Sequence, residues 1–250
     1  MRIANCVFSL IFQPIPEIRR SVFDIEDRLD GYVKPFQIYP IPDEAPFGLP
    51  RISATTESGH STLTIAAQNA QVQTIFDDIF SNDFEKCLNY SKEKALALRN
   101  ALSSMSGFAI EYAGLSAQLV VSADEFGARP VEFIKDTYLT VNSDLSLSDA
   151  AARLVYNVEE DYYLNLEVRK AVFSDPVSIN IEPDSIAVTA KVTPHEDQLV
   201  FVVDFNNRLA FNKGRRLGCD SNTIDVLYRK VLAFASDGVA AFLNEGKVKF

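Results

Sequence analysis

The spacing of hydrophobic residues alternates between strand-like and helix-like along this chain, and the same order of elements is predicted in its first and second parts. In the first part, a buried-type strand at Val7 to Phe12 precedes a helical stripe between Pro16 and Tyr32. The proline-rich segment Lys34 to Pro50 is expected to be extended and irregular. Short β-like runs from Arg51 to Phe80 predict an antiparallel meander. A helix that starts near Asp83 and ends before Gly107 completes this part.

The second part is predicted to follow the same order. Phe108 to Val121 is β-like with a break at Gly114, and Val131 to Val141 is a further candidate strand. Ser146 or Ser148 can cap the helix that follows. Three strands come next, at Tyr162 to Phe173, Val177 to Thr193 (folded back at Pro183-Asp184) and Gln198 to Phe205.

The most regular helical pattern lies at the end of the chain. Its apolar residues keep a spacing of three and four: Ile224, Leu227, Val231, Ala235, Val239 and Phe242. Asn222 is the expected N-cap, with Asp225 as the acidic residue three positions later. This segment is expected to be a long helix that closes the second part.

Together these patterns predict an α+β protein built from two diverged halves. Each half has the order β-α-β-meander-α, an antiparallel sheet and a long closing helix. The first half spans residues 1–106 and the second spans residues 107–250. No segment between them is rich enough in Gly, Ser or Pro to be a flexible linker, so we expect the halves to pack as one rigid body. The repeated order of elements reflects either an internal duplication or only the fact that an antiparallel sheet closed by a helix is common among proteins.

The composition is that of a globular chain with enough apolar residues for a large core. It has 250 residues, 47% of them hydrophobic, so no disulfide or metal is needed for stability. The formal net charge of −10 disfavours binding to nucleic acid or to an anionic membrane. The cysteines (Cys6, Cys87 and Cys219) are far apart and predict reduced thiols in a cytoplasmic protein. No apolar run approaches the ~18 residues of a membrane span, and the N-terminus is expected to be a strand, not a signal peptide.

Searches for catalytic, metal and phosphate motifs favour a protein that is not an enzyme. His60 and His195 both lie in polar turns, and the nucleophile elbow G-x-S-x-G is absent. Neither of the common glycine-rich phosphate loops occurs. The candidates for metal ligands are acidic groups at Asp77-Asp78, Asp83-Glu85 and Glu159-Glu160-Asp161. We predict no catalytic residue, no metal ligand and no cofactor.

One basic segment stands out in this acidic protein. The run from Arg208 to Gly218 contains no acidic residue. Its four cations are Arg208, Lys213, Arg215 and Arg216. Because the run leads into the final helix, whose N-terminus favours anions, it is a candidate site for a phosphate, a carboxylate or an acidic partner segment. The alternative is that Arg215 and Arg216 pair with the chain's own carboxylates, such as Asp204 or Asp220.

The aromatic residues have two interpretations. Phe is abundant (18 residues), Tyr is moderate (9) and Trp is absent. Tyr156, Tyr162 and Tyr163 lie close together in the sequence and could stack on a base or line a pocket. Such residues more often fill a core and carry their hydroxyls to its rim, which is the role we expect.

Three segments carry a resemblance to known proteins. They are Phe8 to Pro14, the hairpin from Pro50-Arg51-Ile52-Ser53 to Glu57-Ser58-Gly59-His60, and the passage from Val202-Val203-Asp204-Phe205 to Ile224-Asp225-Val226-Leu227-Tyr228 with Phe242 near the end. Together they resemble a sporadically distributed, uncharacterised bacterial family of similar length, a resemblance that implies no catalytic residues. The order of strands and helices in each half is also similar to that of the saddle-shaped TATA-binding protein. This resemblance implies a binding surface. A helix-grip fold, which implies an apolar cavity, is the alternative.

The leading functional hypothesis is a non-enzymatic cytoplasmic protein that binds another macromolecule. A protein partner is expected, with the chain acting as a homo-oligomer or within a multi-gene bacterial system such as phage defence or a mobile element. One alternative is a small-ligand sensor with an apolar pocket under the final helix. Another is a metal-dependent nuclease or hydrolase that uses the acidic groups.

Overall fold

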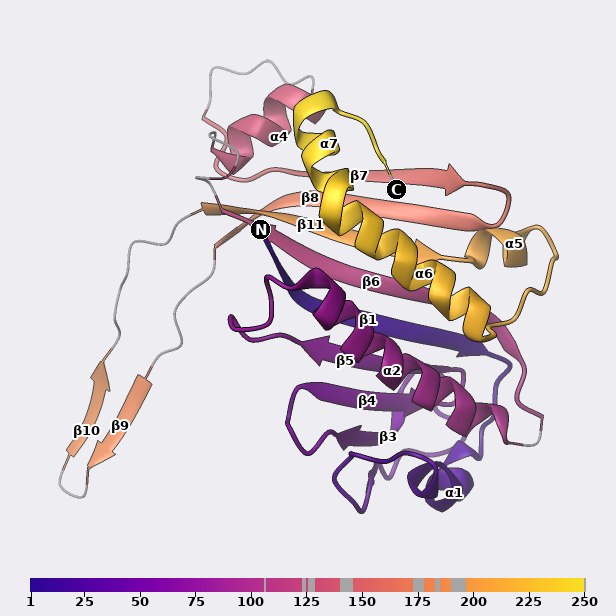
Figure 1. The fold of residues 1–250 in the computed structure, drawn as a ribbon. Helices are drawn as coiled ribbons and strands as arrows, with labels where there is room; N and C mark the ends of the chain where they lie inside the picture. The colour runs from indigo at the N-terminus through magenta and orange to yellow at the C-terminus, as the bar shows by residue number, and fades with distance from the viewer. Residues whose placement is uncertain are drawn as a thin grey trace.

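A nine-stranded antiparallel sheet forms the centre of the molecule (Figure 1). The computed structural model describes residues 1–105, 107–122, 125, 129–139, 146–172, 178–182, 185–189 and 197–249. The strands follow one another across the sheet as β2 (Gln37–Ile38), β3 (Pro50–Thr55), β4 (Ser61–Ala66), β5 (Asn69–Ile75), β1 (Arg2–Phe12), β6 (Ile110–Val121), β11 (Asp197–Asn206), β8 (Tyr162–Val172) and β7 (Ala151–Val158). The predicted α+β class is therefore confirmed.

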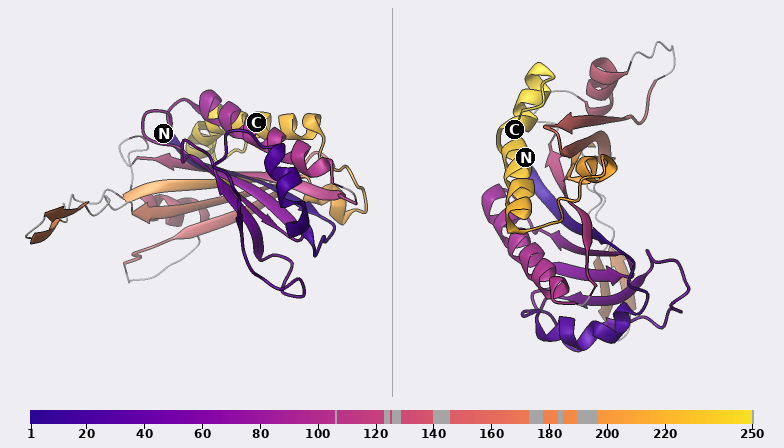
Figure 2. Two further views of the ribbon diagram at one scale, coloured as in Figure 1. Left: turned by 90° about the horizontal axis from the view of Figure 1, so that it is seen from below. Right: turned by 90° about the vertical axis from the view of Figure 1, so that its right-hand side faces the viewer.

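Two long helical segments, α2 and α6, lie against each other over one face of this sheet (Figures 1 and 2). The helical elements are η1 (Ile18–Ser21), α1 (Val22–Asp27), α2 (Phe84–Ser103), α4 (Pro130–Tyr138), α5 (Arg208–Asn212), α6 (Ser221–Ala233), the π-helical turn η2 (Phe234–Gly238) and α7 (Val239–Glu245). As expected, α2 begins at Asp83, whose carboxylate accepts the N–H of Lys86. The N-cap of α6 is Asp220, not Asn222, because the Asp220 carboxylate accepts the N–H of Thr223.

Alternation along the middle of the central strands separates the two faces of the sheet. In β1, Cys6, Phe8 and Leu10 are fully buried on the face covered by the helices. Val7 and Ser9 lie between them and point to the other face. The space beneath the final helix is filled by side chains no more than 1% exposed: Ile224, Leu227, Val231, Phe234 and Phe242. One face of the sheet is thus apolar and covered, and the other is open and polar, as antiparallel sheets permit.

Two predicted elements of the second part have the opposite secondary structure. The expected strand from Val131 onward is the helix α4, in which Pro130 occupies the first turn and Val131 and Ile134 share the buried side. Residues 140 and 141 of that prediction lie outside the described residues. The helix expected after Ser148 is the strand β7, because its apolar residues alternate with a period of two.

Two features of the strands also differ in detail from the prediction. β6 is not broken at Gly114, which pairs with Ser9 on one side and with Asn206 on the other. The fold-back after β8 is confirmed by the antiparallel pair β9 (Ser178–Glu182) and β10 (Ser185–Thr189), although its turn at residues 183 and 184 is outside the described residues. This pair forms its own two-stranded sheet, away from the main sheet (Figure 1).

The middle of the sheet joins the first part of the chain to the second. β1 and β6 pair along nearly their whole length, from Arg2 with Val120 to Phe12 with Ile110. The strands before residue 106 lie on one side of this seam and those after residue 107 lie on the other. In the parts of the chain that the structure describes, no helix is long and apolar enough to cross a membrane.

Candidate functional site

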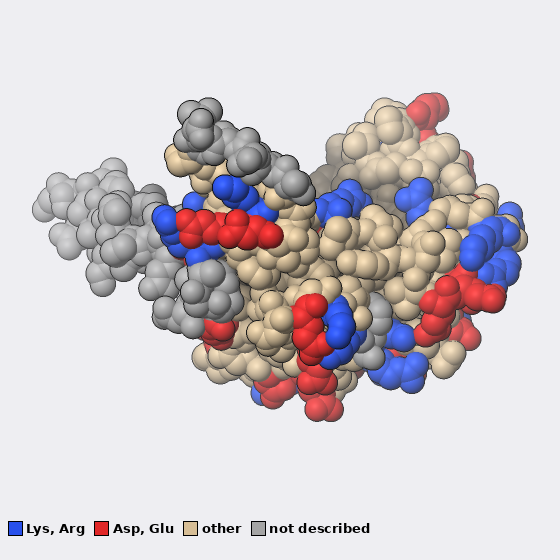
Figure 3. Space-filling model, turned by 90° about the horizontal axis from the view of Figure 1, so that it is seen from above, with Lys and Arg blue, Asp and Glu red and all other residues tan. Residues whose placement is uncertain are grey.

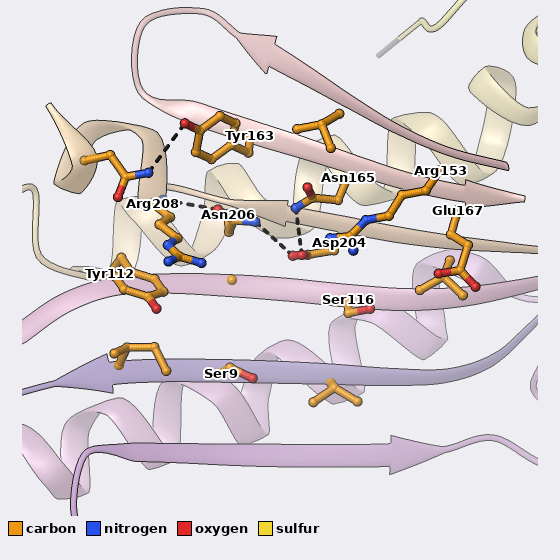
Figure 4. A pocket seen from close by; sticks show the side chains of 16 residues that line it. Ser9, Tyr112, Ser116, Arg153, Tyr163, Asn165, Glu167, Asp204, Asn206 and Arg208 are labelled. Carbon is orange, nitrogen blue, oxygen red and sulfur yellow. Dashed lines mark hydrogen bonds between the residues drawn. The ribbon is translucent and has the colours of Figure 1, made fainter. Parts of the chain in front are cut away.

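The open face of the sheet contains a hollow of about 660 Å³ (Figure 4). It crosses β1, β6, β11, β8 and β7, and α5 lies at one end. Figure 2 shows α2 and α6 on the opposite side of the sheet. Its polar and charged lining residues are Ser9, Tyr112, Ser116, Arg153, Tyr163, Asn165, Glu167, Asp204, Asn206, Arg208 and Asn212. The volume is in the range of pockets that bind small molecules or short segments of a larger ligand.

A fixed carboxylate, that of Asp204, lies in the middle of the hollow. The side-chain amide of Asn165 donates to Asp204 Oδ2 at 2.9 Å, and that of Asn206 donates to Oδ1 at 3.1 Å. The register between β8 and β11 places Asn165 directly opposite Asp204, and alternation places Asn206 on the same face. Each carboxylate oxygen has two lone pairs, so each retains one acceptor position. No cation of the described residues lies within 4.0 Å of this carboxylate.

An exposed guanidinium, that of Arg208, lies at the α5 end of the hollow (Figure 4). Its Cζ is 5.6 Å from the ring centroid of Tyr112. That ring packs in turn against the ring of Phe211, with the two ring centroids 5.5 Å apart. The backbone N–H of Arg208 donates to Asn206 Oδ1 at 3.2 Å. Within the described residues no carboxylate oxygen lies within 4.0 Å of this guanidinium. Its planar fork of donors therefore has the geometry to take a carboxylate in a bidentate pair.

The end of the hollow at β7 carries a second pair of charges. Arg153 of β7 is opposite Glu167 of β8 in the register, and both line the hollow. Glu167 forms an ion pair with Arg169 at 3.3 Å, so part of its charge is compensated. Cations and carboxylates therefore alternate across the hollow, and its lining is not dominated by one sign of charge.

The structure separates the four cations that the sequence groups in one basic run. Only Arg208 lines the hollow. Lys213 Nζ donates to the carbonyl of Glu160 at 3.0 Å, and Arg215 donates to the same carbonyl at 2.6 Å. Arg215 also pairs with Asp161 at 2.5 Å, so its carboxylate partner is in the β7–β8 turn and is neither Asp204 nor Asp220. Arg216 is exposed on the surface.

Buried hydrogen bonds fix the segment between α5 and α6 to the sheet. Asn207 is 1% exposed, and its Oδ1 accepts the N–H of Ala113 at 2.7 Å. Its side-chain amide donates to the carbonyl of Gly218 at 3.0 Å. Arg99 of α2 donates to the carbonyl of Cys219 at 2.9 Å. These contacts position Arg208, because the residue before it is held at both ends of its side chain.

The N-terminus of α6 is occupied by the chain's own carboxylate. Asp220 Oδ1 accepts the N–H of Thr223 at 2.7 Å and its hydroxyl at 2.8 Å. These two hydrogen bonds stabilise the charged form and lower the pKa of Asp220. A second anion at this helix end would meet a negative charge already in place.

The remaining sequence candidates are dispersed over the molecule. His60 lines a separate hollow of about 630 Å³ beside the first turns of α2, together with Cys87. Burial raises the pKa of the Cys87 thiol to about 11, so this thiol is protonated at neutral pH. His195 lies outside the described residues.

Asp77 and Asp83, two of the acidic candidates, have local structural partners. Asp77 accepts the N–H groups of Ile79 and Phe80, and Asp83 caps α2. The described part of the chain holds no cluster of three or more His, Cys, Asp or Glu residues that could bind a metal ion.

The sequence analysis missed the central residues of the hollow. The sequence points to Asp204 as a possible partner for the basic run and as part of a resemblance, and it singles out neither Asn165 nor Asn206. The available signal was polarity inside an apolar strand, because Asp204 interrupts the run from Leu199 to Phe205. Tyr163, which was weighed as a pocket residue but expected in the core, lines the hollow.

Comparison of the chain with protein-family models and with curated proteins finds no match in either set.

Proposed function

We propose that this chain is a binding protein that takes a segment of a partner protein into the hollow on its open sheet face. The observation that carries the proposal is the pair formed by Asp204 and Arg208. Asn165 and Asn206 hold the Asp204 carboxylate, Arg208 lies against the ring of Tyr112, and in the described structure neither charge has an ion-pair partner. A ligand that offers hydrogen-bond donors at one point and an anion at another would satisfy both. A polypeptide segment with an acidic side chain has these features.

The charge pattern favours a peptide over a nucleic acid. The hollow combines Arg153 and Arg208 with Asp204 and Glu167, so a chain of phosphates would meet carboxylates as well as cations. The net charge of −10 adds repulsion against a polyanion at long range.

Each part of the hollow has a role in this proposal. Arg208, held against Tyr112, receives the carboxylate of an Asp or Glu side chain in the partner. Asp204 accepts backbone or side-chain N–H groups of the same segment. Tyr112 and Tyr163 supply rigid aromatic surface of the kind enriched at protein interfaces.

A selection from a displayed library of random peptides tests this function. We expect the unmodified protein to enrich peptides that contain Asp or Glu. The same selection with Arg208→Ala should lose this enrichment, whereas Arg216→Ala, which removes a cation of the same basic run outside the hollow, should keep it. Selection of the same peptides by Arg208→Ala, or no enrichment by the unmodified protein, would contradict the proposal.

We also propose that residues 1–106 and 107–250 are diverged copies that fold as one rigid body, each with a long helix over its half of the sheet. The order of strands supports this, because from the central seam outward it is β1, β5, β4, β3 on one side and β6, β11, β8, β7 on the other. In both, the first strand of the half is central and its last sheet strand is next to it. One continuous buried core across both halves supports a single cooperative unfolding transition, and two separated transitions in calorimetry would contradict it.

A further inference from the structure

In the part of the chain that the structure describes, the strand β7 forms an edge of the nine-stranded sheet and pairs only with β8. Its backbone groups can be assigned to the two sides of the strand. The N–H of Lys170 donates to the carbonyl of Ala150, the residue just before β7. Since ladder hydrogen bonds alternate in an antiparallel pair, the even-numbered residues of β7 bond to β8. The N–H and C=O groups of the odd-numbered residues, from Ala151 to Asn157, therefore point out of the sheet.

Among the described residues, this edge has few of the features that usually prevent strand pairing, and Arg153 is the one charged side chain of β7. β7 is eight residues long, and it contains no proline and no lysine. At the opposite edge, β2 has two residues and lies within the proline-rich segment Lys34 to Pro50. The side chains of Ala151, Arg153, Val155 and Asn157 are all exposed. Val155, which lies at the centre of the strand, is 56% exposed.

We propose that β7 pairs in the antiparallel direction with β7 of a second copy of this chain, with the two-fold axis at Val155. In this register the two Val155 residues face each other, and Arg153 of each copy faces Asn157 of the other. On the helix-covered side of the sheet, Leu154 faces Tyr156 and Ala152 faces Val158. The outward-pointing backbone groups then complete each other's hydrogen bonds.

The sequence of β7 favours a second copy over an unrelated strand because it is complementary to itself. Apolar residues face apolar residues on one side, and no pair of like charges is formed on the other. Figure 3, which views the molecule from the side of this edge, shows cations and carboxylates intermixed. Such a surface does not repel its own copy as a field of one sign would. Because Arg153 and Val155 also line the hollow, the pairing would bring two hollows next to each other. The inference itself does not depend on what the hollow binds.

Opposite charges introduced at Asn157 provide the sharpest test. In the proposed register Asn157→Glu places a carboxylate opposite Arg153 of the second copy, twice per dimer. Asn157→Arg instead places two like charges opposite each other. Within one chain, residues 153 and 157 are four positions apart along an extended strand and do not meet. Asn157 does not line the hollow.

We expect Asn157→Glu to lower the dimer dissociation constant by about two- to thirty-fold and Asn157→Arg to raise it by a similar factor. Analytical ultracentrifugation over a range of protein concentrations measures the dimer dissociation constants of both variants. We expect Asn157→Glu to tighten the dimer even though the substitution adds a negative charge to a chain whose formal net charge is already −10. A monomer at all concentrations, or a shift of both variants in the same direction, would overturn the proposal.

A proline at Val155 tests the backbone pairing separately. The N–H of Val155 points away from β8, so Val155→Pro removes no hydrogen bond of the β7–β8 ladder and edge strands tolerate proline. The variant should remain folded by circular dichroism and should sediment as a monomer. Val155→Thr, which keeps the N–H and the branched side chain, should remain a dimer. A folded Val155→Pro protein that is still a dimer would overturn the proposed interface.

Discussion

Gly114 of β6 faces Asn206 of β11 so closely that a β-carbon on Gly114 would lie 2.9 Å from the Cβ of Asn206. Real β-carbons do not approach that closely, so one of the two strands would have to move. Gly114→Ala should therefore separate β6 from β11 at this point and shift Asn206, which holds the Asp204 carboxylate. We expect a loss of about 1–3 kcal/mol in the free energy of unfolding, as for other overpacked sites.

Ser116→Ala is the matched control for this substitution. Ser116 lies two residues further along β6 and lines the same hollow. Denaturant unfolding of the two variants should show a clear loss for Gly114→Ala and little change for Ser116→Ala. Equal stability of Gly114→Ala and the unmodified protein would mean that the strands can separate without cost.

Asn207 should contribute to stability and to the order of the segment that follows it. Asn207→Ala leaves the buried N–H of Ala113 and the carbonyl of Gly218 without the amide that pairs with them. The expected cost is about 1–3 kcal/mol, because an unsatisfied buried polar group loses its hydration without compensation. Limited proteolysis should also cut between Arg208 and Gly218 faster than in the unmodified protein. Asn212→Ala, at an exposed position, is the control and should change neither quantity.

The buried thiols should make the protein less stable at alkaline pH. Burial raises the pKa of Cys87 to about 11 and that of Cys219 to about 12, from about 9 in the unfolded chain. Below pH 9 both states are protonated and the contribution of the thiols to stability is complete. As the pH rises from 9 towards 11, the unfolded state loses these protons before the folded state does, so the free energy of unfolding falls.

The variant with Cys87→Ala and Cys219→Ala isolates this effect. This variant should be less stable than the unmodified protein at neutral pH. Its free energy of unfolding should nevertheless fall less steeply between pH 9 and 12 than that of the unmodified protein. Parallel curves for the two proteins would show that the thiols do not titrate on unfolding.

The parts of the fold that were predicted correctly have long and regular local patterns. The helix α2 has both a cap at Asp83 and apolar residues at helical spacing, the strand β8 has sustained alternation, and the strand β11 has a continuous apolar run. α4 and β7 are short, and in each of them a few apolar residues fit either spacing. Their assignment depends on packing against the sheet, which the local sequence does not contain.

The hollow depends on contacts between distant segments, and for that reason most of it was not predicted. Asn165 meets Asp204 only because β8 and β11 pair in one register. The sequence places four cations in one basic run. Its division into Arg208 in the hollow and Arg215 on the surface is set by the turn at Glu160 and Asp161, which lies some fifty residues earlier in the sequence.

The most direct test of the central claim is the dissociation constant of one selected acidic peptide, measured by calorimetry with three proteins. These are the unmodified chain, Arg208→Ala and Arg216→Ala. A charged hydrogen bond in a protein contributes about 1.5–3 kcal/mol, so Arg208→Ala should weaken binding by about ten- to a hundred-fold. Arg216→Ala should bind like the unmodified protein. Equal affinities of Arg208→Ala and Arg216→Ala would contradict the assignment of the hollow as the binding site.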